Sequence, residues 1–379
     1  MKLNIYENAF FELLKNIIWG SEINLKGFEK DNDDFWKQII DLAVNNGLYN
    51  MLIDSLNALP KEYQPSKTIK LAWVANNYSI EETYRYTVEA CCEIQDIFHK
   101  NGLKFMVMKG IGLSTLYPNP VLREFGDIDF YVFGDYDKAN EVAEKAGAIL
   151  DSSPDYKHKL IHYKGVPLEN HKFFTNQAHY TADKIIENYL NKTLERDECV
   201  EAKIPNTDKF IMTPPANFNA LFLTKHMLNH FPTNLCFRQL VDWCIFLKHY
   251  HDKIDKTFLL KAVTESDYLD IASILSSVCV KTLGLNPEYN PYPEVDDSVL
   301  EYKVFHSILY YGKPVERSKN PLISNYQKFS RFWRNRWKNK LTTKKSTLGL
   351  ILLYFKMKNY NILDIFDLKK NDQSKKSDK

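Results

Sequence analysis

Residues 123–133 read REFGDIDFYVF and place two aspartates, Asp127 and Asp129, one residue apart in front of an apolar run. Successive side chains on a β-strand point to opposite faces, so these two carboxylates share one face while Ile128 and Phe130 share the other. We therefore expect a strand that is buried on one side and carries two like charges on the other.

The sequence on either side of this stretch alternates between strand and helix patterns. Residues 104–110, KFMVMKG, are typical of a short buried strand, and the next ten allow one or two helical turns. Residues 135–147 predict a helix that begins at an aspartate N-cap and ends at a glycine. Residues 158–174, HKLIHYKGVPLENHKFF, predict two strands joined by a Lys-Gly turn. This order of elements predicts an α+β core with a small mixed β-sheet.

Helical patterns flank this core on both sides. Apolar residues recur at three- and four-residue spacing before residue 80 and again after Pro214, and the first twenty residues read as an amphipathic helix, not as a signal peptide. We expect an N-terminal helical region at 1–80, the core at 81–205, a C-terminal helical domain at 206–315, and a basic amphipathic segment with a disordered tail at 316–379.

Composition sets limits on the function. The 379 residues carry 50 Lys and Arg against 48 Asp and Glu, so the net charge of +2 indicates no overall preference for an acidic partner. The longest apolar run, residues 348–355, is too short to span a bilayer. None of the six cysteines lies in a Cys-x-x-Cys pair, which favours free thiols in a reducing compartment. We therefore expect a cytoplasmic protein.

The aspartate pair has three common explanations: solvated surface charges, a general acid/base pair, or ligands for divalent metal. Mg²⁺ prefers carboxylate oxygens, and phosphoryl-transfer sites often hold two such ions about 3.5–4 Å apart. Glycine lets the backbone approach a phosphate, and Gly110 ends the strand that precedes the pair. Glu169 and His171 share a face of a later strand, so Glu169 is a candidate third carboxylate.

The sequence resembles the nucleotidyltransferase superfamily of the DNA polymerase beta type. The likeness rests on four motifs in this order: Lys109-Gly110, Arg123, Gly126-Asp127-Ile128-Asp129 and Glu169-x-His171. The pattern is similar in particular to a bacterial family of uncharacterised nucleotidyltransferases. The likeness covers residues 81–175 and extends more weakly to residues 224–247.

The resemblance implies a Mg²⁺-dependent enzyme that moves an NMP from an NTP to a hydroxyl acceptor and releases pyrophosphate. Asp127 and Asp129 would bind two Mg²⁺ ions that carry the nucleotide, and Glu169 would be the third acid. The phosphates would meet Gly110 and the following amides, with Lys109 or Arg123 neutralising their charge. The serine that the superfamily places after the glycine is missing, since Ile111 and Gly112 follow Gly110. Further candidate nucleotide contacts, from the helix that follows the core, are Lys225 and His226.

Two other functions remain open from the sequence. The same fold could hold a nucleotide without turning it over, or the chain could be a basic-tailed nucleic-acid-binding protein. His226 and His230 have the i, i+4 spacing of a zinc pair, although a packing role is the commoner explanation. The same spacing of Arg238 and Asp242 suggests an ion pair within one helix.

The basic segment 328–345 contains eight basic residues and no acidic one. Its aromatic residues recur at helical spacing and predict a single amphipathic helix, which could pack on the body, lie on an anionic membrane or contact nucleic acid. We expect packing on the body, with Trp333 and Trp337 mostly buried and Arg334 and Lys338 exposed.

Overall fold

The computed structural model describes residues 2–124, 126–152, 156–176, 181–310, 318, 320–346 and 348–352. The tail expected to be disordered lies almost entirely outside these residues. No helix in the described residues is long and apolar enough to cross a membrane. All six cysteines are free, as the sequence predicts.

A five-stranded mixed sheet forms the centre of the predicted core. Its strands are β1 (Phe105–Met108), β2 (Ile128–Val132), β5 (Val166–His171), β4 (His158–Tyr163) and β3 (Ile149–Leu150), in that spatial order. β2 runs antiparallel to β1 and parallel to β5, and β5 pairs antiparallel with β4. A separate hairpin of β6 (Val200–Lys203) and β7 (Phe210–Thr213) packs on β1. The α+β fold class with a small mixed sheet is confirmed.

The two faces of the sheet have different chemistry. One face carries alternate apolar residues such as Phe105 and Phe130, whose ring centroids lie 5.1 Å from each other and 5.6 Å from that of Phe98 on α4 (Lys67–Lys100). α6 (Tyr136–Lys145) also covers this face. The alternation predicted for residues 127–133 therefore holds, and it leaves Asp129 and Tyr131 on the opposite face.

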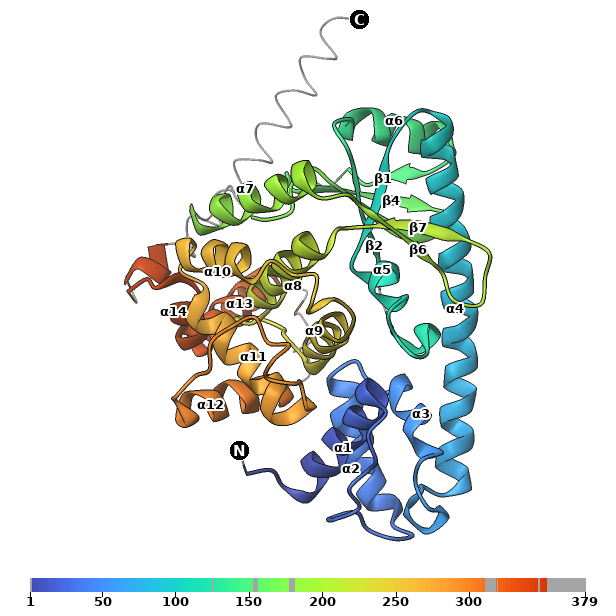
Figure 1. The fold of residues 1–379 in the computed structure, drawn as a ribbon, viewed down its shortest axis with the longest axis vertical. Helices are drawn as coiled ribbons and strands as arrows, with labels where there is room; N and C mark the ends of the chain where they lie inside the picture. Colours follow the sequence, from blue (N-terminus) through green and yellow to red (C-terminus); the bar gives the residue numbers. More distant parts are fainter. Residues whose placement is uncertain are drawn as a thin grey trace, which may run out of the picture.

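A single long helix connects the N-terminal helices to the sheet (Figure 1). α4 begins at Lys67, where the Ser66 side chain accepts a hydrogen bond from the Ile69 amide, and it runs through the domain boundary expected at residue 80. The short elements before α4 are α1 (Ile5–Trp19), α2 (Asp33–Asn45), η1 (Asn50–Leu52), α3 (Ile53–Leu56) and η2 (Lys61–Tyr63).

The two helical regions share one hydrophobic core although the sheet separates them in sequence. Phe11 of α1 packs edge-on against Phe237, with ring centroids 4.9 Å apart, and also contacts Phe305. The helices on the C-terminal side are α7 (Thr181–Arg196), α8 (Ala216–His230), α9 (Phe237–Tyr250), α10 (Lys256–Glu265), α11 (Leu269–Leu283) and α12 (Ser298–Leu309).

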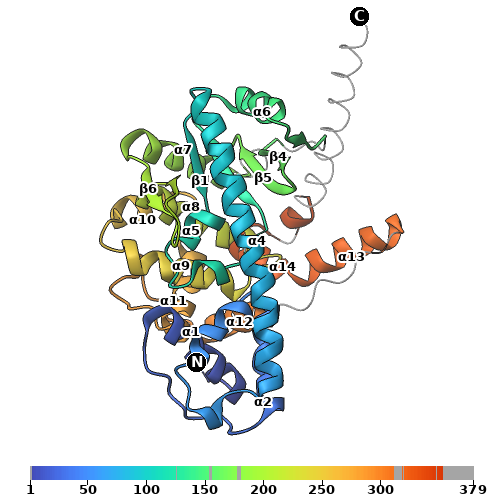
Figure 2. The same cartoon turned by 90° about the vertical axis from the view of Figure 1, so that its right-hand side faces the viewer.

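The basic segment departs from its prediction. It forms two helices, α13 (Pro321–Arg334) and α14 (Arg336–Thr343), separated at Asn335, whose side chain donates to the Pro232 carbonyl. Figure 2 shows α13 extending away from the body.

Only part of the predicted burial in this segment is correct. Trp337 packs edge-on against Phe231 and Arg334 is exposed, as expected. Trp333 is 39% exposed and Lys338 only 4%, so both of these predictions are wrong. The physical reason is that the aromatic stripe is divided between two helices. α14 packs on the helical core and buries the aliphatic stem of Lys338, whereas Trp333 lies on α13, which extends away from the body.

Candidate active site

Parallel pairing of β2 with β5 brings the predicted acids together. Asp129 lies directly opposite Glu169 in the register, and both side chains belong to the face that is not covered by α4 and α6. Asp127 immediately precedes β2, and the charges of Asp129 and Glu169 both act on it. The charge of Asp129 also acts on Glu169.

Asp129 is the most deeply buried of the three acids and has two cationic or polar partners. Its Oδ1 lies 2.8 Å from Lys109 Nζ and 2.9 Å from His171 Nε2. Burial acts to raise the pKa of Asp129, but the Lys109 charge and the His171 contact outweigh it and hold that pKa well below its ordinary value. Asp129 is therefore ionised at neutral pH.

Glu169 sits between two imidazoles. His158 Nε2 is 3.4 Å from its Oε1, and His171 Nε2 is 3.6 Å from its Oε2. Burial acts to raise the pKa of Glu169. The hydrogen bond with His171 is the largest of the opposing effects, which together hold that pKa below its ordinary value. His158 belongs to β4, directly opposite His171 in the antiparallel register.

Asp127 has the opposite electrostatic situation. Burial, and then the charges of Asp129 and Glu169, raise the pKa of Asp127 to about 6. A carboxylate that resists ionisation because like charges surround it is suited to a cationic ligand.

The turn between β1 and α5 (Gly110–Ser114) approaches the acids from the β1 side. Lys109 has φ 44°, a strained conformation for a residue with a side chain, and Gly110 has φ 36°. Burial acts to lower the pKa of Lys109, but the Asp129 charge prevails and raises it, so the side chain is an ammonium. Gly112 packs on the sheet: a Cβ there would lie 3.1 Å from the Val107 carbonyl oxygen.

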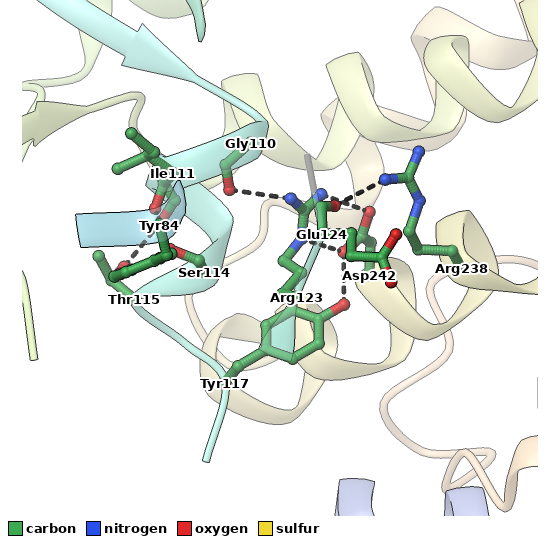
Figure 3. A network of polar contacts seen from close by, with 11 residues as sticks. Tyr84, Gly110, Ile111, Ser114, Thr115, Tyr117, Arg123, Glu124, Arg238 and Asp242 are labelled. Carbon is green, nitrogen blue, oxygen red and sulfur yellow. Dashed lines mark hydrogen bonds and ion pairs between the residues drawn. The ribbon is translucent and has the colours of Figure 1, made fainter. Parts of the chain in front are cut away.

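Arg123 is buried in a network that joins this turn to the C-terminal helices (Figure 3). Its Nε and Nη2 donate to the two carboxylate oxygens of Asp242 at 2.8 Å, and Nη1 donates to the Gly110 carbonyl at 3.1 Å. The Tyr117 hydroxyl also donates to Asp242. Asp242 thus pairs with Arg123 from a distant segment, while Arg238 donates to the Glu124 carbonyl.

The two candidates on α8 lie in different places. Lys225 is buried, with Nζ 2.7 Å from Asp183 and donating to the Tyr268 hydroxyl at 3.0 Å. Burial, and then the Lys109 charge, lower the pKa of His226 well below its ordinary value. The neighbouring Phe222 ring lies 5.8 Å from Lys109 Nζ. His226 is therefore a neutral imidazole on the α8 side of the site.

Sequence reasoning missed His158. A signal was available: strands joined by the two-residue Lys164-Gly165 turn form an antiparallel hairpin, in which Tyr163 pairs with Val166 and His158 therefore with His171. The nucleotide-binding roles predicted for Lys109, Gly110, Gly112, Arg123, Lys225 and His226 stay predictions.

Comparison with known proteins identifies a family. Residues 32–284 match the family described as "Uncharacterised nucleotidyltransferase". No curated protein matches the chain. Among solved structures, the antibiotic-resistance factor ANT(2'')-Ia in solution is 13% identical, with 50% of this chain and 96% of that chain covered and a TM-score of 0.36. A tRNA nucleotidyltransferase complexed with a primer tRNA and an incoming ATP analogue is 12% identical, with 74% and 99% covered and a TM-score of 0.22. At these TM-scores neither likeness establishes a shared fold.

Proposed function

The chain belongs to the uncharacterised nucleotidyltransferase family, and on that premise we propose that it transfers an NMP from a metal-bound NTP to a hydroxyl acceptor and releases pyrophosphate. The observation that carries this proposal is that Asp129 lies directly opposite Glu169 on the paired strands β2 and β5, with Asp127 near enough for both charges to raise its pKa.

The donor set fits divalent metal. Burial, and then the charges of Asp129 and Glu169, raise the pKa of Asp127, and the Lys109 charge offsets only part of this effect. Bound Mg²⁺ ions would neutralise the triphosphate and make the acceptor hydroxyl a better nucleophile. Asp127 and Asp129 would hold both ions, and Glu169 would hold the ion on the acceptor side.

The remaining residues divide into contact and positioning roles. Lys109 is the only ammonium in the described residues that pairs with Asp129. With a metal ion held by that carboxylate, Lys109 Nζ would be free to contact a phosphate oxygen. The amides that follow Gly110 would approach the β- and γ-phosphates. Arg123 holds the Gly110 carbonyl and so positions this turn, and Gly112 permits it to pack on β1.

The α8 residues complete the proposal. His226 is a neutral imidazole beside the acids, suited to a hydrogen bond with the nucleotide. Lys225, paired with Asp183, holds α8 against α7 and would act on the nucleotide through that placement.

The test incubates the purified chain with each α-³²P-labelled NTP, Mg²⁺, and candidate acceptors in separate reactions: tRNA, aminoglycosides, sugars and the protein itself. Label transfer together with pyrophosphate release supports the proposal. Asp129→Asn should abolish transfer, since the amide removes the ligand charge while keeping nearly the same volume. Asp208→Asn, in the loop between β6 and β7, is the matched control and should transfer as the wild type does. Transfer that survives Asp129→Asn would refute the site assignment.

A further inference from the structure

His171 is held in one tautomer by the backbone. Its Nδ1 lies 3.1 Å from the Phe173 carbonyl oxygen, and a carbonyl oxygen only accepts, so Nδ1 carries the hydrogen. In the neutral ring Nε2 is then a bare lone pair. That lone pair faces Asp129 Oδ1 at 2.9 Å and Glu169 Oε2 at 3.6 Å. The Lys109 ammonium, 2.8 Å from the same Asp129 oxygen, balances part of this negative charge. A further cation between Nε2 and the Glu169 carboxylate would balance the rest.

A second imidazole completes the cluster. One ligand atom from each of His158, Glu169 and His171 lies within 4.8 Å of the others. The distances of 3.4 and 3.6 Å from the two imidazoles to Glu169 are close to the spacing of about 3.3 Å between ligands placed 2.0–2.1 Å from a tetrahedral ion. The sheet holds the cluster in place, since Glu169 and His171 share one face of β5 and His158 lies opposite His171 on β4.

We propose that His171, His158 and Glu169, with Asp129, form a mixed imidazole and carboxylate centre that binds a divalent transition ion in preference to Mg²⁺. Imidazole suits ions from Mn²⁺ to Zn²⁺, whereas Mg²⁺ favours an all-oxygen shell. The hydrogen bond from Nδ1 to the Phe173 carbonyl is the arrangement that orients a metal-ligating histidine through its other nitrogen. This inference rests on the proposed function, because that proposal makes Asp129 and Glu169 metal ligands. It adds the two imidazoles to the ligands and names the class of metal ion.

Metal binding can be measured without nucleotide. The full chain is titrated with Mn²⁺ while electron paramagnetic resonance counts free Mn²⁺, and Mg²⁺ affinity is obtained by competition. Pulsed measurements on bound Mn²⁺ then detect coupling to imidazole nitrogen.

The main variant is His171→Asn, whose amide can still donate to the Phe173 carbonyl but has no atom at the position of Nε2. His158→Asn removes the second imidazole. His162→Asn is the matched control, because His162 lies on the same strand, opposite Pro167 and away from the carboxylates. Thermal melting of each variant separates loss of metal from loss of fold.

The wild type is expected to show nitrogen coupling and to bind Mn²⁺ more tightly than Mg²⁺. His171→Asn should lose the coupling and about 10- to 100-fold in Mn²⁺ affinity, with a smaller loss for Mg²⁺. His162→Asn should match the wild type. Bound Mn²⁺ without nitrogen coupling, or an equal loss for both ions in His171→Asn, would overturn the inference.

The two proposals fail separately. Nucleotide transfer with Mg²⁺ and no nitrogen coupling would leave the transferase proposal standing and remove the imidazole centre. Nitrogen coupling without any transfer would do the reverse.

Discussion

Replacing Asp127 by asparagine should stabilise the metal-free protein at neutral pH. Its pKa rises from an ordinary 3.8 to about 6, because burial and two neighbouring carboxylates disfavour the charge. At about 1.4 kcal/mol for each pKa unit, that shift corresponds to about 3 kcal/mol of destabilisation when the carboxyl is ionised. The side chain is only partly buried, and screening by solvent and salt reduces the expected gain from Asp127→Asn to about 1–2 kcal/mol.

The gain should depend on pH in a defined direction. A raised carboxyl pKa means that the folded state binds the proton more tightly than the unfolded state, so Asp127 costs stability progressively as pH rises from about 4 through 6. The stability difference between Asp127→Asn and the wild type should therefore be largest at pH 7.5 and fall to about half at pH 5.

Urea unfolding of both proteins in EDTA at pH 5 and pH 7.5 measures this difference, with Asp208→Asn as the surface control. Adding Mg²⁺ or Mn²⁺ at a hundred times its Kd should reverse the order, because the ligand then stabilises the protein that binds it by about 2.7 kcal/mol, which exceeds the gain of about 1–2 kcal/mol. If Asp127→Asn is less stable than the wild type in EDTA, or if metal stabilises both equally, the reasoning about repelled carboxylates is refuted.

Three further predictions concern packing, one beside the site and two in the helices α13 and α14. Arg123→Met should lower the free energy of unfolding by about 3–5 kcal/mol, because it leaves the Asp242 carboxylate buried without its bidentate partner; a loss below 1 kcal/mol in urea titration would contradict this. Burial lowers the pKa of Lys338 to about 8, so its charge lowers the folding stability fully below pH 8, and this loss disappears as pH rises towards 10.5. Lys338→Met should therefore stabilise the protein more at pH 7 than at pH 9.5, which thermal melts at the two pH values measure. Trp337→Ala should lower stability by about 2–4 kcal/mol while Trp333→Ala stays within about 0.5 kcal/mol, and equal thermal shifts in the two variants would show that α13 packs as α14 does.

Local patterns in the sequence were enough to identify the reactive face of each strand. The period of two along residues 127–133 and 166–171 places Asp127 with Asp129, and Glu169 with His171, whatever the strands pair with. The same local rules predicted the order of strands and helices through the core. They hold because the direction of a side chain depends only on the backbone of its own strand.

The pairing of strands that lie far apart in the sequence was decided by the tertiary structure. Parallel pairing of β2 with β5 sets Asp129 opposite Glu169. The antiparallel pairing of β4 with β5, which adds His158 to the cluster, follows instead from the two-residue turn that joins them. The ion-pair partner of Asp242 was likewise determined by the tertiary structure. The i, i+4 spacing suggested Arg238, whereas the folded chain pairs Asp242 with Arg123, 119 residues away in the sequence.

The helical regions show the same division. An apolar stripe predicts that a helix buries one face, but it does not name the surface that covers it. Phe11 at one end of the chain meets Phe237 and Phe305 near the other, and the aromatic stripe of the basic segment divides between the packed α14 and the projecting α13. The hydrophobic effect is non-directional, so an apolar face is stabilised by burial against any apolar partner. Only the complete arrangement of helices therefore determines which faces meet.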